Sequence, residues 1–463
     1  MRIAPTTPAP PSRSLLVPIF GLCAAAALGA AACAVGDESH SDATVEGTGG
    51  SGVGGAPGTG GSGVAGATGT GGAVGAGGTT GGGGRLAGTG GSIGTGGMPA
   101  AGGRTGSGGT PVTGTGGTPG VGGFTGVCAS QASTATRPQL TAAQAANDTI
   151  LKYLAQAGPQ GALNTDNWNP TAGLGSVAAF PGDLVVAADG SGTQRTVQAG
   201  LTAATGTARR YILVKPGTYR ETITINTATP ITIYGAGDPT QVVIINGVSA
   251  AAAGGTAQSA TMTVRNNGFQ IVNLTISNDF AGAATGDNQA VALFTTGDKV
   301  VMQNVRLHGF QDTLYIDSSS PTTVARVYIK GSFIEGDTDF IFGRSTAVID
   351  GSTLNYLSSR KGTGSGVYMA PSTSVGNNFG FLISGCNFTS DASAPANKIS
   401  LGRSWDQSST VPTPNGQAVI RESTLGVHIN RTAPWATSTG SRVFSATGNR
   451  FGEFCNSGPG AAP

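Results

Sequence analysis

Short runs of β-branched and aliphatic residues recur along the second half of the chain, each closed by a polar residue or a glycine. Six runs share one form: a strand-like stretch, a pivot residue, two variable positions and an apolar residue. They are FQIVNLTI (269–276), KVVMQNVRL (299–307), RVYIKGSFI (326–334), TAVIDGSTL (346–354), GFLISGCNF (380–388) and QAVIRESTL (417–425). Their pivots, Asn273, Asn304, Gly331, Gly351, Gly385 and Glu422, are separated by 31, 27, 20, 34 and 37 residues.

A repeat of roughly 20–35 residues made of strands and turns predicts a parallel β-solenoid, in which each repeat is one coil. Earlier strand-like runs extend the pattern back to Phe180, and this stretch shows no helical period. A β-sandwich also contains many short strands, but it gives no reason for a repeated pivot. Propeller blades have a longer repeat, usually with an aromatic signature of their own. The pattern therefore predicts an all-β solenoid.

One helical pattern precedes the strands. Thr141 and Gln144 have the spacing of a capping box. Apolar residues then recur at helical spacing until Gly158–Pro159, namely Ala146, Ile150, Tyr153, Leu154 and Ala157. The sequence predicts one short amphipathic helix with a structural role, capping an end of the core.

The composition of the N-terminal part is different. Of the 80 glycines, 39 lie between residues 47 and 126, where the only charges are Arg85 and Arg104. Such a stretch cannot bury enough apolar surface to offset its ordering entropy. We therefore expect four parts: an export signal at 1–33, a disordered Gly/Thr/Ser-rich linker at 34–127, a helix and lead-in at 128–179, and the β-helix catalytic domain at 180–463.

The first residues have the features of an export signal. Arg2 and Arg13 precede an apolar stretch, 15–32, that ends in small residues. The stretch is short and rich in Gly and Ala, which disfavours a retained membrane span. Ala-Ala-Ala-Cys, ending at Cys33, resembles a weak bacterial lipobox without its usual leucine. Simple secretion and a lipid anchor at Cys33 both stay open, and the long linker favours the anchor slightly. Either predicts a secreted or cell-surface protein.

Charge and metal-binding residues narrow the function classes. The net charge is +2, with 10% charged residues and no Lys/Arg cluster, so nothing indicates a nucleic-acid partner. The histidines, His40, His308 and His428, lack metal-ligand spacing, and we expect no metal. Of the cysteines beyond the targeting segment, Cys386 lies in an apolar run and fits a core position. Cys128 and Cys455 flank the folded region and could pair outside the cytoplasm.

Two aspartates occupy the same offset from successive pivots. Asp312 lies eight residues after Asn304, and Asp339 lies eight residues after Gly331. If both coils follow one path, the carboxylates lie one strand spacing apart, about 4.8 Å. Like charges at that distance should raise the pKa of one carboxyl group and so separate an acid from a nucleophile or base. The alternative is that the two residues only cap turns.

Five sequence motifs, two of which contain these aspartates, strengthen the functional interpretation of the pair. They are KPGTYRETI (215–223), NQAVALF (288–294), GFQDTLY (309–315), GDTDFIFG (336–343) and LGRSW (401–405). In this order they resemble the pectinesterase (pectin methylesterase) family. GFLISGCNF before LGRSW, and the ending RFGEFCNSGPGA (450–461), resemble its bacterial members. The resemblance covers about Phe180 to Ala461.

This resemblance implies a right-handed parallel β-helix that removes methyl esters from galacturonate units without a metal or cofactor. Asp339 would be the nucleophile. Asp312 would protonate the departing methanol and then activate water. Gln289 and Gln311 would donate to the oxyanion, and Arg403 would hold Asp339 ionised and oriented.

The resemblance also implies a sugar-binding cleft lined by Tyr315, Phe342 and Trp405, with Thr256 contacting substrate. Three positions depart from the family pattern. Ser404 replaces a proline and should alter the rigidity of its loop. Thr338 replaces an aliphatic residue, and the histidine that often precedes NQAVAL is missing. The expected partner is methyl-esterified pectin, and we expect a monomer.

Other functions fit the sequence less well. The GxSxG at 90–94 that a serine hydrolase would need lies in the glycine-rich linker, with no strand before it. A glycosidase needs a differently spaced carboxylate pair, and a calcium-dependent lyase needs an acidic cluster. A non-catalytic carbohydrate-binding solenoid would be expected to lack a member of the Asp/Asp/Gln/Gln/Arg set. A family relative acting on another ester or a thioester stays open.

Overall fold

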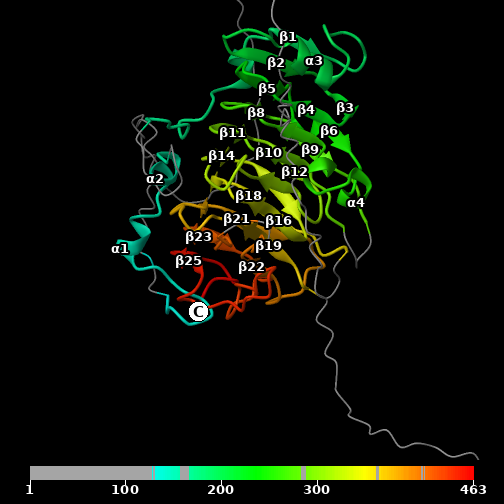
Figure 1. The fold of residues 1–463 in the computed structure, drawn as a ribbon. Helices are drawn as coiled ribbons and strands as arrows, with labels where there is room; N and C mark the ends of the chain where they lie inside the picture. Colours follow the sequence, from blue (N-terminus) through cyan, green and yellow to red (C-terminus); the bar gives the residue numbers. More distant parts are fainter. Residues whose placement is uncertain are drawn as a thin grey trace, which may run out of the picture. The chain divides into compact units, whose positions relative to one another are not determined.

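A computed structural model of the protein describes residues 128, 131–156, 166–282, 288–360, 364–407, 410 and 412–463. The predicted export signal and linker lie outside the described residues. Successive coils contribute strands to three parallel sheets, here called A, B and C, so the fold is a parallel β-helix (Figure 1). The predicted solenoid is confirmed.

Within the described residues, sheet A has ten strands, sheet B eight and sheet C seven. Sheet A contains, in order, β1 (Leu184–Val186), β2 (Arg210–Val214), β5 (Ile231–Gly235), β8 (Gln270–Val272), β11 (Val300–Gln303), β14 (Arg326–Lys330), β17 (Thr346–Asp350), β20 (Phe381–Ser384), β23 (Gln417–Arg421) and β25 (Arg450–Phe454). Sheet B contains β3 (Gly217–Arg220), β6 (Val242–Asn246), β9 (Thr275–Asn278), β12 (Arg306–His308), β15 (Phe333–Gly336), β18 (Thr353–Tyr356), β21 (Asn387–Ser390) and β24 (Thr424–Leu425). Sheet C contains β4 (Ile223–Ile225), β7 (Met262–Val264), β10 (Leu293–Thr295), β13 (Leu314–Ile316), β16 (Thr338–Gly343), β19 (Val367–Pro371) and β22 (Ser400–Gly402).

The six predicted pivots form the corner between sheets A and B. All have φ between 52° and 62°, in the left-handed region that Gly and Asn adopt most readily. The residue after the pivot builds a ladder between coils: Ser332 N donates to Ser352 Oγ at 3.0 Å, and Ser352 N donates to Cys386 Sγ at 3.4 Å. Cys386 is buried, as predicted, and is one rung of this ladder.

The core is a stack of identical inward positions. One row of sheet A pairs residue with residue and is fully buried: Ile271, Met302, Ile329, Ile349, Ile383 and Ile420. Burying each such side chain contributes about 1.5–3 kcal/mol. Repeated rows of this kind fix the register of every coil, because a one-residue slip would turn the row outward.

The helical segment before the β-helix is broken into α1 (Ala142–Ala145) and α2 (Ile150–Leu154), so the prediction of one continuous helix is wrong. The predicted capping box of Thr141 and Gln144 is present. Thr149 is the N-cap of α2, because its side chain accepts a hydrogen bond from Lys152 N at 3.3 Å. Ala157 and Gly158–Pro159 lie outside the described residues.

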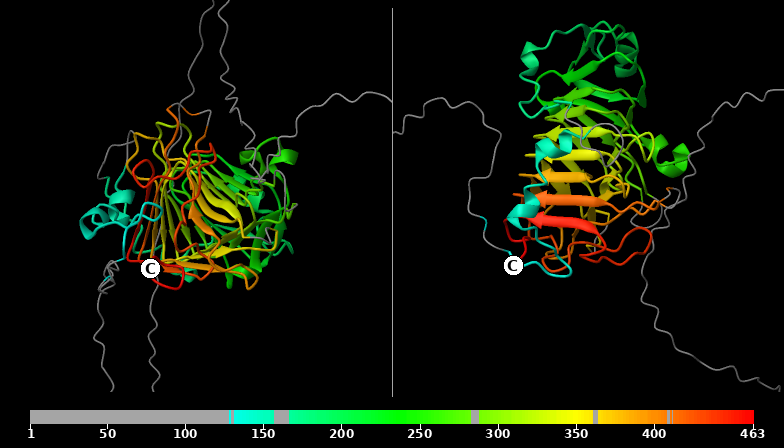
Figure 2. Two further views of the ribbon diagram at one scale, coloured as in Figure 1. Left: turned by 90° about the horizontal axis from the view of Figure 1, so that it is seen from below. Right: turned by 60° about the vertical axis from the view of Figure 1, so that its left-hand side comes forward.

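These helices lie along the outer face of sheet A instead of across an end of the core (Figure 2). α2 packs on β14, β17 and β20, where Tyr153 and Leu154 join an apolar cluster with residues of sheet A. Farther along the lead-in, Asp166 pairs with the buried Arg326 at 2.8 Å. The hydrogen bond from Arg326 lowers the pKa of Asp166.

Helical turns also occur within the strand region, contrary to the prediction of none beyond Phe180. They are α3 (Val197–Ala203), α4 (Ala250–Ala253), η2 (Pro239–Gln241) and η3 (Ala257–Ser259), while η1 (Val177–Ala179) precedes β1. α3 buries Val197 and Leu201 against the first strands and covers that end of the core. No helix among the described residues has the length and apolar character needed to span a membrane.

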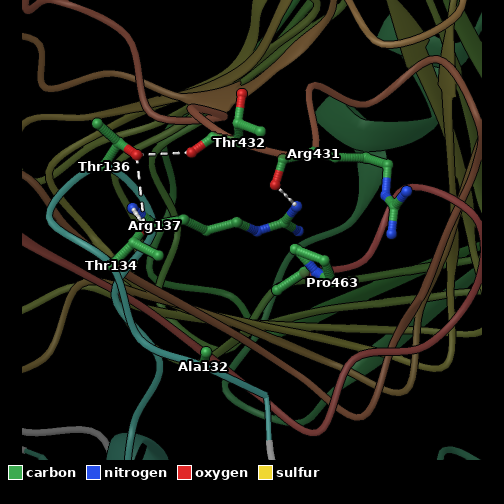
Figure 3. A pocket seen from close by; sticks show the side chains of 8 residues that line it. Ala132, Thr134, Thr136, Arg137, Arg431, Thr432 and Pro463 are labelled. Atoms are coloured by element: carbon green, nitrogen blue, oxygen red, sulfur yellow. Dashed lines mark hydrogen bonds between the residues drawn. The ribbon is translucent and has the colours of Figure 1, made fainter.

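The lead-in is fastened to the last coil. Arg137 donates from Nε and Nη2 to the two carboxylate oxygens of Glu453, each at 2.8 Å, and both side chains are buried. Cys128 and Cys455 form a disulfide with Cα atoms 5.3 Å apart, which confirms the suggested pairing. Figure 3 shows a pocket at this junction, where Arg137 donates to the Arg431 carbonyl at 2.7 Å.

Candidate active site

The two aspartates lie in register on adjacent coils. Gln311 pairs with Thr338 on one side of them, and Leu314 pairs with Ile341 on the other. Asp312 is therefore opposite Asp339, as the equal offsets predicted. Both side chains are largely buried, with 5% and 7% exposed. This places two carboxyl groups at equivalent positions, one strand apart.

The backbone conformation at each aspartate sets the direction of its carboxylate. Asp312 has φ 69° and Asp339 has φ 47°, a conformation that costs a non-glycine residue about 1 kcal/mol. Next to Asp339 the pairing of β16 with β19 is irregular, because Thr338 pairs with Val367 and Ile341 with Met369. The extra residue on β16 is a β-bulge, a feature that redirects side chains at functional sites.

Arg403 forms an ion pair with Asp339. Its Nε lies 2.9 Å from Oδ1 and 3.1 Å from Oδ2, and its Nη2 lies 2.5 Å from Oδ2. Arg403 follows β22 directly, and its amide donates to the Met369 carbonyl at 3.0 Å. A guanidinium held by its own backbone fixes both the charge and the orientation of the carboxylate.

Two glutamines and a threonine stack beside the carboxylates, since Gln289 pairs with Gln311 and Gln311 with Thr338. Thr256, predicted to contact substrate, donates to Gln289 Oε1 at 2.7 Å. Because Thr256 bonds its Oε1, the NH2 group of the Gln289 amide points away from Thr256. Gln311 Oε1 and Thr338 Oγ1 are buried and have no hydrogen-bond partner among the described residues.

An aromatic cluster flanks the site. Tyr315 stacks on Phe342, with ring centroids 4.2 Å apart, and on Phe294, with centroids 4.6 Å apart. Trp405 lies against this stack, 5.6 Å from Phe342. Tyr315 and Phe342 are only 3% and 4% exposed, so Trp405, which is half-buried, presents more of its ring to a ligand. Phe294 was missed, although it ends the motif NQAVALF.

A polar chain supports this cluster and was also missed. Tyr315 Oη donates to Asp317 at 3.0 Å, and Arg344 Nε donates to Asp317 at 2.7 Å. Arg344 Nη2 then donates to Gln407 at 2.8 Å. The chain links the stack to the loop that carries Arg403. Its sequence signal was the alternation that places Tyr315 and Asp317 on one face of the strand.

A second buried ion pair adjoins the site. Arg360 donates to both oxygens of Asp337, at 2.7 and 3.0 Å, and lies 4.7 Å above the Phe310 ring. Asp337 is the first aspartate of GDTDFIFG, two residues before Asp339. Its buried charge is matched by Arg360, so the two aspartates of this motif have different partners.

The histidines do not join the carboxylates. His308 contacts Glu335 through Nδ1. His428 is buried and bonds Tyr368 at 2.6 Å, and His40 lies outside the described residues. Among the residues that the structure describes, no group of His, Cys, Asp and Glu is arranged to hold a metal ion. The pocket in Figure 3 lies at the junction of the lead-in and the last coil, away from the aspartates.

Comparisons with known proteins find pectinesterases both by sequence and by structure. A family model described as Pectinesterase matches residues 183–463. A pectinesterase of Ralstonia nicotianae is 44% identical over 367 residues, covering 71% of this chain and 92% of the relative. The structure of rice weevil pectin methyl esterase matches with a TM-score of 0.62 at 32% identity, covering 72% of this chain and 100% of that one. An Escherichia coli relative that carries the provisional name acyl-CoA thioester hydrolase is 31% identical, covering 65% of this chain and 79% of the relative.

Proposed function

This chain belongs to the pectinesterase family, and from that premise we propose that it hydrolyses the methyl esters of pectin to pectate and methanol. The observation that carries the proposal is the pair of buried carboxylates in register, Asp312 and Asp339, with Arg403 on both oxygens of Asp339. Matched by a guanidinium, Asp339 suits the nucleophile. Asp312, the carboxyl group on the adjacent coil, serves as the acid and base that transfers the proton.

In the first step an oxygen of Asp339 attacks the ester carbonyl carbon. The carbonyl oxygen becomes an oxyanion and accepts hydrogen bonds from the amides of Gln289 and Gln311, which stabilise charge without titrating. The bond to the methoxy group then breaks, and Asp312 gives its proton to form methanol. The product of this step is an acyl-enzyme on Asp339.

In the second step Asp312, now a carboxylate, takes a proton from water as the water oxygen attacks the acyl carbon. The bond to Asp339 breaks, which releases a galacturonate carboxyl group and restores both aspartates. Arg403 stabilises the charge that returns to Asp339. Trp405, with Tyr315 and Phe342 behind it, provides the surface for a sugar ring.

Another ester or a thioester is the second candidate substrate, favoured by the provisional name of the Escherichia coli relative. The same Asp and Gln groups would serve a thioester, because acyl transfer to Asp339 and hydrolysis are common to both. The two candidates differ in the group that leaves.

Methanol release from highly methylated pectin tests the proposal, with acyl-CoA hydrolysis measured in parallel. We expect the wild type to release methanol. Asp339→Asn should lower kcat by roughly 10³-fold or more, and Asp312→Asn by roughly 10²- to 10⁴-fold. Asp189→Asn, at an exposed turn, is the matched control and should keep full activity.

The results separate substrate from mechanism. A wild type that cleaves acyl-CoA and releases no methanol would overturn the pectin assignment. An Asp339→Asn variant with full activity would overturn the mechanism, whatever the substrate.

We also propose that the protein is exported, either secreted or held at the cell surface by a lipid on Cys33, and acts as a monomer without a nucleic-acid partner. The Cys128–Cys455 disulfide supports export, because such bonds persist in oxidising compartments. Mass spectrometry of the mature N-terminus should find either a lipidated Cys33 or a cleaved, unmodified end. An intact Met1 on the mature protein would contradict export.

A further inference from the structure

The loop after β22 carries two residues of the candidate site with a buried serine between them. The amides of Arg403 and Trp405 donate to Met369 and Pro371 on β19, each at 3.0 Å. Ser404, between them, is 1% exposed. Its Oγ accepts from Gly416 N at 2.8 Å, and Gly416 directly precedes β23. The hydroxyl therefore joins this loop to the start of the next coil.

Other contacts of the loop converge on the same serine. The Ser404 carbonyl accepts from Thr439 N at 3.0 Å. Burial disfavours the charge on Asp406, but hydrogen bonds from Arg442, Ser438 and Ser404 outweigh it and lower the pKa of Asp406. Arg442 holds that carboxylate at 2.7 Å. Ser404 is thus bonded to two later segments of the chain through both its backbone and its side chain.

We propose that Ser404 is a positioning residue whose hydroxyl fixes the loop so that Arg403 stays in bidentate contact with Asp339. The inference rests on the proposed ester hydrolysis and assigns Ser404 no contact with substrate. It also accounts for the absence of the stiffening proline found in the motif that LGRSW resembles.

The hydrogen bond from Gly416 N to the Ser404 hydroxyl is the side-chain hydrogen bond nearest to Arg403 along this loop. The next attachment along the loop is at Asp406, two residues beyond Ser404, whose amide donates to Thr439 Oγ1 at 3.1 Å and whose carboxylate pairs with Arg442. Without the hydroxyl, the chain can shift where it carries the guanidinium. Small displacements of catalytic groups lower rates steeply, because the reaction needs near-attack geometry.

Three variants of the full chain test this role. Ser404→Ala removes the hydroxyl. Ser404→Pro removes it too but restricts the backbone, and among the described residues the Ser404 amide donates to no acceptor that a proline would deprive. Ser372→Ala is the matched control, because Ser372 is a neighbouring buried serine whose Oγ has no partner among the described residues. The measurements are kcat and KM for methanol release, thermal stability, and hydrogen exchange of the 403–407 segment.

Ser404→Ala should lower kcat about tenfold with KM within twofold, and should speed exchange in 403–407. Both Ser404 variants should lose stability, since each leaves the buried Gly416 N–H unbonded. Ser404→Pro should nevertheless keep kcat within about twofold of wild type, which a purely structural role would not predict. Ser372→Ala should leave kcat, KM and exchange in 403–407 unchanged, and it should not lower stability, because its hydroxyl makes no bond among the described residues.

An unchanged kcat in Ser404→Ala overturns the proposal, as does a Ser404→Pro variant that loses as much kcat as Ser404→Ala. If the wild type releases no methanol, the pectin assignment fails by itself. In that case hydrogen exchange of the 403–407 segment still tests the positioning role of Ser404. Unchanged exchange in Ser404→Ala overturns that role, and faster exchange supports it.

Discussion

At the scale of single residues, the polar atoms beside the aspartates fall into two groups. Gln289 Oε1 accepts from Thr256, whereas Gln311 Oε1 and Thr338 Oγ1 are buried without a partner among the described residues. A buried polar group without a hydrogen bond costs about 1–3 kcal/mol. Thr338→Val should therefore raise the free energy of unfolding by about 1 kcal/mol, measured by urea denaturation, with activity within about twofold of wild type.

Thr256→Val is the contrasting variant. It removes a hydroxyl that is bonded to Gln289, so it should lower stability by about 1 kcal/mol and also lower kcat, because the Gln289 amide loses its orientation. If Thr338→Val destabilises the protein as much as Thr256→Val does, the Thr338 hydroxyl has a partner in solution and the distinction fails.

His428 gives a residue-scale prediction about pH. Tyr368 donates its hydroxyl hydrogen to Thr389 O, so His428 donates to Tyr368 from Nε2 and its Nδ1 carries no proton. Burial lowers the pKa of His428 to about 4. In the unfolded chain the pKa is about 6.5, so the unfolded state binds more protons between pH 6.5 and 4. Stability should fall as pH falls through that window, by up to about 3 kcal/mol.

His428→Gln isolates this effect. The variant should be less stable at pH 7, yet its stability should change less than that of the wild type between pH 6.5 and 4.5. Urea unfolding of both proteins across this range measures the difference. Equal pH dependence in the two proteins would mean that His428 is not the group responsible.

The sequence was informative about residues whose position follows from the repeat. Asp312 and Asp339 could be aligned because both lie eight residues after a pivot, before the point where the lengths of the two coils diverge. Phe294, Arg344 and Arg360 could not be assigned, because their importance comes from contacts between coils or from loops of variable length. Spacing along the chain does not encode those contacts.

At the scale of the element, the pivots could be predicted because one backbone conformation selects few residue types. A left-handed corner favours Gly and Asn, and these recur at Asn273, Asn304 and Gly331. The break between α1 and α2 could not be predicted from apolar spacing. The second start depends on the Thr149 cap, while the apolar positions continue in phase.

Gly331 provides the element-scale prediction. A Cβ added there would meet no heavy atom within 4 Å, so a substitution changes only the backbone preference at φ 54°. Gly331→Ala should destabilise the protein by about 1 kcal/mol, and Gly331→Asn by less, because asparagine adopts this conformation more readily. Chemical denaturation measures both. An alanine variant as stable as the asparagine variant would show that the corner sets no conformational demand.

At the scale of the whole described molecule, the lead-in was the least predictable part. Its helix pattern indicated burial on one face but carried no information about which surface would cover that face. In the structure it runs along sheet A from the last coil back towards the first, fastened by the Arg137–Glu453 pair at one end (Figure 1). These contacts join residues that are far apart in the sequence, so they depend on packing and cannot be predicted from a local sequence pattern.

The disulfide yields the prediction at this scale. Cys128 and Cys455 are 327 residues apart, and closing a long loop restricts the unfolded chain. Bonds of this kind typically contribute about 2–5 kcal/mol, so a reductant should lower the melting temperature of the wild type. Activity at 25 °C should be unchanged, because the bond lies next to the last strand of sheet A, whereas Asp339 lies in β16 of sheet C and Asp312 just before β13 of the same sheet.

The double variant Cys128→Ser/Cys455→Ser separates the bond from other effects of the reductant. It should melt at the temperature of the reduced wild type and should not respond to the reductant. Cys386 cannot mimic the response, because it is buried and burial raises the pKa of its thiol to about 12, which keeps it unreactive. If the reduced wild type melts as the oxidised one does, Arg137, Glu453 and the packing of α2 hold the lead-in without the covalent link.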